Sequence, residues 1–510
     1  MIALGLLLSV AVPLIAGLPW ILILQRDRQL GNWPLALAYG YVLGLLIAIV
    51  WMRVLDVVHA PANLLTIIAI PALAAIAGWR KLRGRLHWAR DAAHASKLTW
   101  ASMNRTTRMV VIVVIGLIAF RLLTLGAEIV IRPIFPWEAV SAVAAKARVW
   151  YDLGSIARFV PPPALLEGIG SYTDADASAY ALPSLLLAFT AHMLGQWHEG
   201  AVAFPWWMMG LAMVLALYGH VRRSGAGVAF SLSVAYVFVS LPLVDLHIGL
   251  AGAPQWIAAT GVGLAGCAML RWLETPSREL LFYVVVGAAL ALMSLLSAWP
   301  WFVVFALSAA MARWPRYARK LAIGIPLVLL FALLAWQQTP FKWGGSTLQL
   351  QVVTTWSESI ESLFLLDNWH LLYGASILVA VLGWRFIVAP SWRARSWLVG
   401  MGVVVLFVWG AVAVPGIWFG GLRDFSYAAL QFAPILVLWT ALAARAMAIP
   451  PAHIEPAVPE TPVAAPAMAA AQSVDPITAP AFGLAVDPVA GPDTSQGTRP
   501  TTGPATTLGP

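Results

Sequence analysis

The sequence predicts an all-α, polytopic membrane protein with about 13 transmembrane helices. Apolar residues dominate it, charges are scarce, and its apolar runs are long enough to cross a bilayer. Of the 510 residues, 61% are hydrophobic and 10% are charged, and the mean hydropathy is +0.82, whereas a soluble globular chain carries about 25% charged residues. Because backbone polar groups in lipid must pair internally, each run of about 20 apolar residues is expected to be a helix.

The candidate spans follow one another along most of the chain. They cover residues 2–24, 33–52, 62–79, 109–131, 201–219, 228–244, 250–270, 280–296, 301–312, 321–336, 371–383, 397–418 and 428–447. A further apolar run, 181–194, is expected to enter the membrane and return, or to lie along its surface. Counted as a crossing, it would place the basic residues of every later loop outside, against the positive-inside rule.

The distribution of basic residues predicts the orientation of the chain. Residues 80–108 are rich in Arg and Lys and contain one acid, Asp91, which places this segment in the cytoplasm. The N-terminus is then outside and the C-terminus inside, as expected for a multi-pass plasma (inner) membrane protein. The net charge of +9 is explained by these short basic breaks, so no nucleic-acid partner is expected.

Three regions are predicted. Residues 1–108 hold the first helices and the basic loop, and 109–448 form a transmembrane core with outer loops 132–179 and 337–370. Residues 449–510 are rich in Ala, Pro, Thr and Gly and are expected to be a disordered tail. The one cysteine, Cys267, lies in an apolar run. The sequence has no His/Cys cluster with metal-ligand spacing, so no metal or other cofactor is predicted.

The first outer loop carries the residues best suited to chemistry. Residues 138–152 are expected to form a helix with Glu138, Arg148 and Asp152 on one face. An acid at the start of this helix could act as a base toward a hydroxyl or amine, and Lys146 and Arg148 could hold a phosphate. The alternative is an interfacial helix with solvated charges, anchored by aromatic residues at headgroup depth.

Two stretches of this loop resemble a known family. Residues 133–139, Pro-Ile-Phe-Pro-Trp-Glu-Ala, and 145–151, Ala-Lys-Ala-Arg-Val-Trp-Tyr, are similar to the first outer loop of integral-membrane glycosyltransferases with the GT-C fold. This class contains protein O-mannosyltransferases and lipid A aminoarabinose transferases. In its bacterial members a Trp-Asp-Ala-like motif starts the loop, and the resemblance implies that Glu138 is the catalytic base.

Three later segments extend the resemblance. The sequence Tyr180-Ala-Leu-Pro is similar to the family's Tyr-Pro signature, and 249–255 resembles its second outer loop. Residues 423–434 resemble the late segment in which an arginine, here Arg423, approaches the donor phosphate. The chain departs from the family where Gln255 replaces the usual second-loop acid and where 297–300 replaces a Lys-x-Glu. These departures leave two readings, an altered substrate preference or a non-catalytic member.

Other polar residues have two interpretations each. Asp245 and His247 could supply the polar function missing from the second loop, or be an ordinary helix-end acid and histidine. Asp174 and Asp176, before Tyr180, could line the acceptor entrance or form a solvated turn.

Glu128, near the outer end of an apolar helix, could form an ion pair with Arg121 or Arg132, or have a functional role.

The resemblance implies a hexosyl- or pentosyltransferase. A sugar would move from a polyprenyl-phosphate donor to a lipid, glycan or protein acceptor at the outer face of the bilayer. Glu138 would take the acceptor proton, and Arg423 with Lys146 or Arg148 would steady the leaving phosphate. The alternatives are a transporter or lipid flippase, whose sites usually lie on broken helices near the membrane midplane, and a non-catalytic membrane protein of the same fold.

Overall fold

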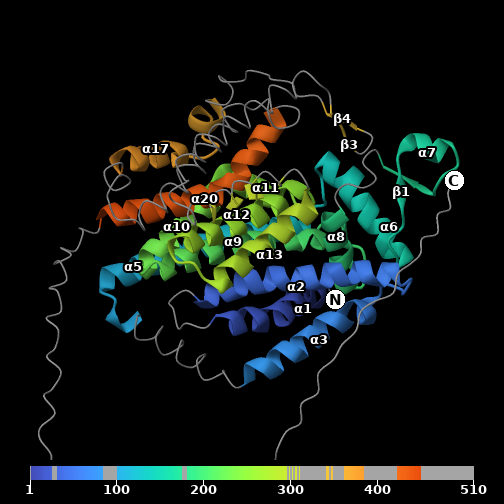
Figure 1. Ribbon diagram of the computed structural model, residues 1–510, viewed down its shortest axis with the longest axis horizontal. Helices are drawn as coiled ribbons and strands as arrows, with labels where there is room; N and C mark the ends of the chain where they lie inside the picture. Colours follow the sequence, from blue (N-terminus) through green and yellow to red (C-terminus); the bar gives the residue numbers. More distant parts are fainter. Residues whose placement is uncertain are drawn as a thin grey trace, which may run out of the picture. The chain divides into compact units, whose positions relative to one another are not determined.

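The computed structural model consists mainly of helices, with two pairs of very short strands (Figure 1). The predicted spans 321–336 and 397–418 and the predicted tail 449–510 lie outside the residues that it describes, so the count of about 13 crossings stays a prediction. The described residues are 2–25, 32–83, 100–174, 181–295, 298, 301–302, 305–306, 309–310, 341–343, 346–348, 361–383 and 422–448.

Seven helical stretches of the described chain are long and apolar enough to cross a membrane. Each coincides with a run predicted from hydropathy, so the protein is a polytopic helical membrane protein, as predicted. The stretches are α1 (Ile2–Leu24), α2 (Asn32–Val57), α3 (Leu64–Leu82), α5 (Arg105–Ile131), η3 with α9 (Ala201–Ala203 and Phe204–Arg223), α12 (Pro254–Glu274) and most of α20 (Leu422–Ala448).

Helix α12 is almost wholly buried among its neighbours. Its glycines let the backbones of other helices approach closely. Gly261 lies against Ala291 of α13 (Arg278–Ser294), and Gly263 lies against Pro434 of α20. Apolar side chains gain little by leaving lipid, so helix association in a membrane depends on such close packing of small residues.

The contact between α1 and α2 has the same basis. Gly17 of α1 faces the carbonyl of Gly40, and Gly44 of α2 faces the carbonyl of Pro13. No side chain separates the two backbones at these points.

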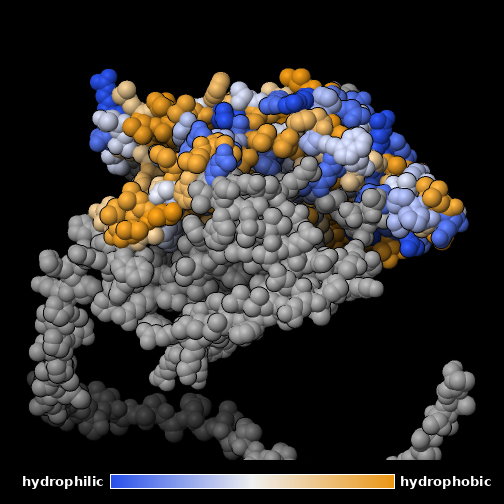
Figure 2. Space-filling view, turned by 90° about the horizontal axis from the view of Figure 1, so that it is seen from above, coloured by the Kyte–Doolittle hydropathy of each residue, from blue (hydrophilic) through white to orange (hydrophobic). Residues whose placement is uncertain are grey.

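Helices α3 and α5 lie at the periphery, where few of their residues are buried. Along α5, Met109, Ile112, Phe120 and Leu123 are exposed. Figure 2 shows broad apolar areas on the described surface. Exposed apolar faces on spanning helices are suited to contact with lipid tails.

The predicted run 228–244 is not one straight helix. It is divided into α10 (Val228–Ser240) and α11 (Pro242–Gly249), which are inclined by 64°. Pro242 has no N–H and disfavours the α conformation of the residue before it, and Leu241 is extended, with φ −62° and ψ 125°. Counted as one broken span, the pair raises the number of candidate spans in the described chain to eight.

Helix α8 (Ala181–Leu194) is too short to cross as a regular helix, because its 14 residues extend about 21 Å. At its end, Leu194 packs on Gly5 of α1, and after it the carbonyl of Glu199 accepts from the amide of Ile134. Before it, Asp174 pairs with Lys146 of α6 (Ala145–Leu153). That the run 181–194 enters the membrane and returns, or lies along its surface, remains a prediction.

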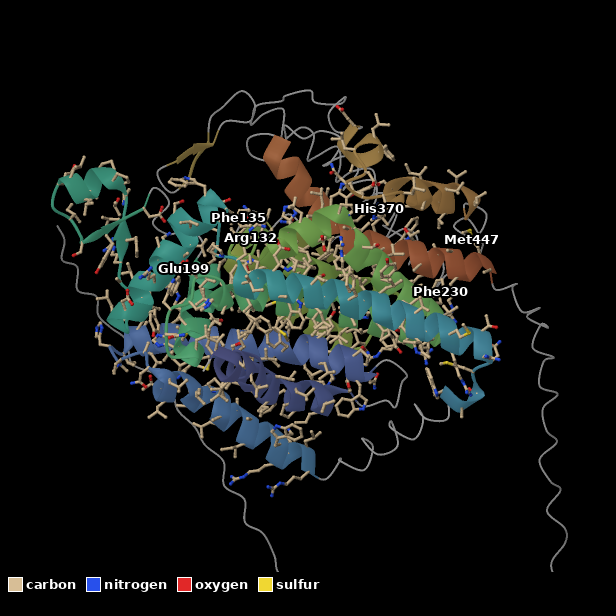
Figure 3. The ribbon with its side chains drawn as sticks, turned by 180° about the vertical axis from the view of Figure 1, so that it is seen from behind. Arg132, Phe135, Glu199, Phe230, His370 and Met447 are labelled. Carbon is tan, nitrogen blue, oxygen red and sulfur yellow. The ribbon has the colours of Figure 1, made fainter. Side chains whose placement is uncertain are left out.

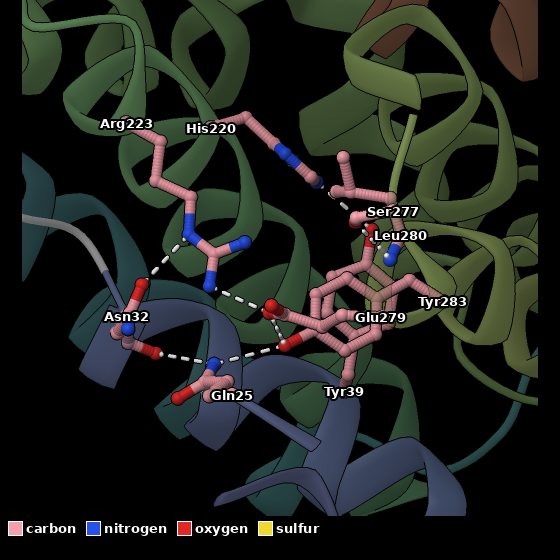
Figure 4. Close-up of polar contacts among 9 residues, drawn as sticks. All are labelled: Gln25, Asn32, Tyr39, His220, Arg223, Ser277, Glu279, Leu280 and Tyr283. Atoms are coloured by element: carbon pink, nitrogen blue, oxygen red, sulfur yellow. Dashed lines mark hydrogen bonds and ion pairs between the residues drawn. The ribbon is translucent and has the colours of Figure 1, made fainter. Parts of the chain in front are cut away.

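A buried polar network joins four helices at the end of the bundle where α9 ends and α13 begins (Figure 4). Arg223 of α9 lies 2.6 Å from Glu279 of α13 and 2.8 Å from the side-chain oxygen of Asn32. Tyr283 donates to Glu279 at 2.6 Å and accepts from Gln25, the residue after α1, at 2.8 Å. Because a buried charge is costly unless it is paired, this network stabilises the ends of α1, α2, α9 and α13 together.

The glycine packing predicts an asymmetric effect of adding one methyl group. Gly44→Ala would overlap the carbonyl of Pro13, whereas no atom lies within 4 Å of the corresponding position at Gly116 of α5. We expect Gly44→Ala to destabilise the protein by about 1–3 kcal/mol, as overpacking does, and Gly116→Ala to be neutral. Thermal unfolding in detergent measures both, and equal stability of the two variants would contradict this packing.

Candidate functional site

Several helix ends meet around Glu138, and we call this end of the bundle the Glu138 end. It is where α2 and α5 finish and where α9 and α12 begin. The Trp206 indole of α9 donates to the carbonyl of Ala253 at 2.7 Å, just before α12. In Figure 3, Arg132, Phe135 and Glu199 lie together at this end, away from Phe230 and Met447.

The centre of the candidate site is a hydrogen bond between the two predicted outer loops. The side-chain amide of Gln255, in the first turn of α12, donates to the Glu138 carboxylate at 2.9 Å. Gln255 is 5% exposed, so its amide is held in place. Gly252, with φ +97°, allows the turn before α12 to pass close to Ile134 and Ala139. The structure therefore brings Glu138 and Gln255 together.

The helix predicted over 138–152 forms, but its first part is not an α-helix. Residues Ala139–Ala144 form a π-helix, η2, which continues into α6. A π-helical turn holds an extra residue and changes the angle between the positions on either side of it. The predicted single face through Glu138, Arg148 and Asp152 therefore does not keep its α-helical spacing. Sequence pattern gave no sign of this turn.

Lys146 is buried and paired. Its side chain is 1% exposed and forms an ion pair with Asp174, while its ammonium lies 5.8 Å from the centre of the Phe159 ring. The strands β1 (Phe159–Val160) and β2 (Tyr172–Thr173) pair in parallel and bring Asp174 to α6, with the short helix α7 (Pro162–Leu166) between them. The Lys146 ammonium is therefore already occupied by a carboxylate.

Arg148 is the more accessible cation of this segment. Its guanidinium lies 3.2 Å from Glu199 and 4.0 Å from Asp152, and all three side chains are more than half exposed. Surface ion pairs of this kind are weak, so Arg148 can exchange partners.

Burial, with Asp152 beside it, raises the pKa of the Tyr151 hydroxyl, which therefore stays protonated as a donor.

Asp245 and His247 are both engaged within the bundle. Asp245 of α11 lies 2.9 Å from Arg121 of α5, and the His247 ring contacts the carbonyl of Leu243 at 2.7 Å. Because Arg121 is used here, Glu128 pairs with Arg132 at 2.8 Å instead. These contacts favour the structural interpretation of Glu128 and Asp245.

Other predicted residues are only partly described. Asp176 and Tyr180 lie outside the described residues. Arg423 lies in the first turn of α20, and its side chain is outside the description. Helix α20 runs parallel to α12, since Gly263 lies against Pro434 and Gly266 against Ile435. The first turn of α20 is therefore directed toward the Glu138 end.

The predicted loop 337–370 is described in three pieces. A hairpin pairs β3 (Phe341–Trp343) with β4 (Ser346–Leu348), and a short π-helix, η5, covers Glu361–Leu365. The helix α17 (Leu372–Leu382) follows. The placement of this loop on the outer side of the membrane remains a prediction.

A small cavity near the Glu138 end was not anticipated from the sequence. Its volume is about 10 Å³, and Asp56, Trp150 and His192 are among the residues that line it. A cavity of this size holds about one water molecule.

Within the described residues, no group of three His, Cys, Asp or Glu side chains could hold a metal ion.

The fold defines a polytopic helical membrane protein, and the candidate site is the Glu138 carboxylate, held by the side-chain amide of Gln255 at one end of the described bundle. The sequence matches no family model, and comparisons with curated proteins and with solved structures give no match. The resemblance to GT-C glycosyltransferases therefore rests on the sequence motifs alone.

The buried ion pair predicts a clear difference between single and double substitutions. Lys146→Met leaves Asp174 without its charge partner and should cost about 3–5 kcal/mol of stability. The double variant Lys146→Met/Asp174→Leu removes both charges and should recover most of the loss. Thermal unfolding measures both proteins, and a double variant as unstable as the single one would show that the pair is not the cause.

Proposed function

We propose that the protein is a membrane glycosyltransferase of the GT-C type, which moves a sugar from a polyprenyl-phosphate donor to an acceptor at the non-cytoplasmic face. The observation that carries the proposal is the hydrogen bond from Gln255 to Glu138. This bond joins Glu138 of the Trp-Glu-Ala motif to Gln255, which stands where GT-C glycosyltransferases usually carry a second acid.

The distribution of charges supports the orientation of this site. The last turn of α3 holds Arg80 and Lys81, that of α9 holds Arg222 and Arg223, and that of α20 holds Arg445. By the positive-inside rule, these ends are cytoplasmic. The Glu138 end then faces the opposite side, where a polyprenyl-phosphate sugar would meet an extracytoplasmic acceptor.

The chemistry needs one base and a group that steadies the leaving phosphate. Glu138 takes the proton of the acceptor hydroxyl while the acceptor oxygen bonds to the anomeric carbon of the sugar. The bond from that carbon to the phosphate oxygen breaks, and the polyprenyl phosphate leaves with the electron pair. Gln255 occupies one carboxylate oxygen of Glu138, so the other can face the acceptor. Direct displacement inverts the anomeric carbon.

The leaving phosphate requires cations that are free to bind it. Arg148 is the better candidate in the first loop because it is exposed, whereas Lys146 is buried beside Asp174. Arg423 is proposed as the second cation, since an arginine can pair with two phosphate oxygens at once. The isoprenoid chain of the donor would remain in lipid beside the bundle.

Replacement of the base tests this proposal. Glu138→Gln keeps the size of the side chain but cannot take a proton, and general-base catalysis contributes about 10²–10⁴-fold. We expect purified Glu138→Gln to lose sugar transfer from candidate polyprenyl-phosphate sugars by at least 10²-fold. Glu199→Gln, at an exposed acid of the same end, is the control and should keep most of the activity. Full activity of Glu138→Gln would exclude Glu138 as the base.

A transporter or lipid flippase is the second candidate, because the 64° break between α10 and α11 resembles the discontinuous helices of transport sites. Consumption of the donor by detergent-solubilised protein separates the two classes, since transport needs two compartments and chemistry does not. Absence of turnover with every donor tested would favour transport or a non-catalytic role.

Chemical labelling tests the orientation. Cys267 is buried, so a Cys267→Ala background permits labelling of single introduced cysteines. On intact cells, a membrane-impermeant maleimide should label Glu199→Cys at the Glu138 end. It should reach Arg278→Cys, at the exposed start of α13, only after the cells are opened. The reverse pattern would place Glu138 in the cytosol and overturn the proposed site.

A further inference from the structure

Two arginines from different helices converge on the turn between α9 and α10, at the basic end of the bundle. Arg222 of α9 donates to the carbonyl of Ala226. Arg445 of α20 donates to the backbone carbonyl of Ser224 and, at 2.7 Å, to its hydroxyl. Gly225 lies between them with φ +82°, and a Cβ there would lie 3.2 Å from the Arg445 guanidinium. The backbone of this turn therefore lies directly against the Arg445 guanidinium.

A third arginine approaches from α12. Arg271 lies within electrostatic range of Arg445 and Arg223. Its side chain is 7% exposed, and one guanidinium nitrogen pairs with Glu274. The Nε of Arg271 is buried and has no hydrogen-bond partner among the described residues. A buried donor left without a partner is costly, so this nitrogen is suited to donate to an acceptor that the described residues do not supply.

The charges around this turn do not balance within the described chain. Arg222 and Arg445 contact backbone carbonyls, and Arg271 pairs with one carboxylate, Glu274, whose side chain is 45% exposed. The neighbouring Arg223 is neutralised by Glu279. Helix C-termini favour cations, which explains why Arg222 and Arg445 contact backbone carbonyls. That effect does not account for the unpartnered nitrogen of Arg271.

We propose that Arg222, Arg271 and Arg445 form a phosphate-binding site at the cytoplasmic end of the bundle, separate from the Glu138 end. Arginine suits this role because its planar guanidinium can pair with phosphate oxygens through two hydrogen bonds. The arginines lie at the ends of spanning helices, the level of lipid headgroups, where basic pockets between helices bind anionic lipids. The phosphate can belong to such a headgroup or be free in solution. The site does not depend on the proposed sugar transfer.

Lipid retention tests the site on the full-length protein. The protein is released from nanodiscs of phosphatidylcholine with a minor fraction of phosphatidylglycerol, and the bound lipids are counted by native mass spectrometry. We expect the wild type to retain phosphatidylglycerol and Arg271→Gln to bind it at least about tenfold more weakly, as loss of a charged hydrogen bond predicts. Arg278→Gln removes the same charge from an exposed position at the same end and should bind like the wild type.

A substitution that is expected to strengthen lipid binding provides a second test, which holds even if Arg271→Gln does not fold. Glu274→Gln removes the carboxylate that competes for Arg271 and should tighten phosphatidylglycerol binding. A second arm adds inorganic phosphate to protein in zwitterionic detergent and follows the midpoint of thermal unfolding. Stabilisation by phosphate, lost in Arg271→Gln, would identify free phosphate as a ligand. Equal lipid retention by all variants, with no effect of phosphate, would overturn the site.

Discussion

Close packing of backbones around α12 is the constraint on which the rest of the described structure depends. In lipid there is little gain from burying apolar side chains, so the bundle is stabilised where Gly261 and Gly263 admit α13 and α20 to short distance. The same helix carries polar residues at both ends, Gln255 beside Glu138 and Arg271 beside Glu274. One rigid element of 21 residues, about 31 Å long, therefore fixes the separation of the two polar regions.

The parts of the fold that follow from local composition were predictable. Length and hydropathy are properties of a continuous segment, which is why the spanning helices from α1 to α5 agree with the predicted runs. The meeting of Glu138 and Gln255 was also within reach, because both were expected in loops on the same side of the membrane. The break before α11 had a signal in the proline at position 242, which was not used in placing the run 228–244.

The remaining features depend on contacts between distant segments. Nothing in the pattern around Lys146 indicates that Asp174 would fold back over it, because that contact requires the β1–β2 pair and α7. The pair of Arg121 with Asp245 joins α5 to α11 and depends on the angle of the broken span. Periodicity describes one helix at a time, so Lys146 and Asp174 were interpreted as facing solvent or substrate, and Arg121 was considered a partner of Glu128 rather than of Asp245. Their partners became visible only in three dimensions.

The π-helical turn after Glu138 has a consequence for how the loop tolerates insertions and deletions. Successive residues of an α-helix are separated by about 100° around its axis. Because a π-helical turn holds one extra residue, loss of one residue from Ala139–Ala144 would relax it to an ordinary α-helix and leave the direction of Glu138 relative to α6 nearly unchanged. Loss of one residue from α6 itself would instead turn Glu138 by about 100° relative to the residues after the deletion. The same one-codon deletion therefore has different consequences on the two sides of Ala145, a difference that inspection of hydropathy alone would pass over.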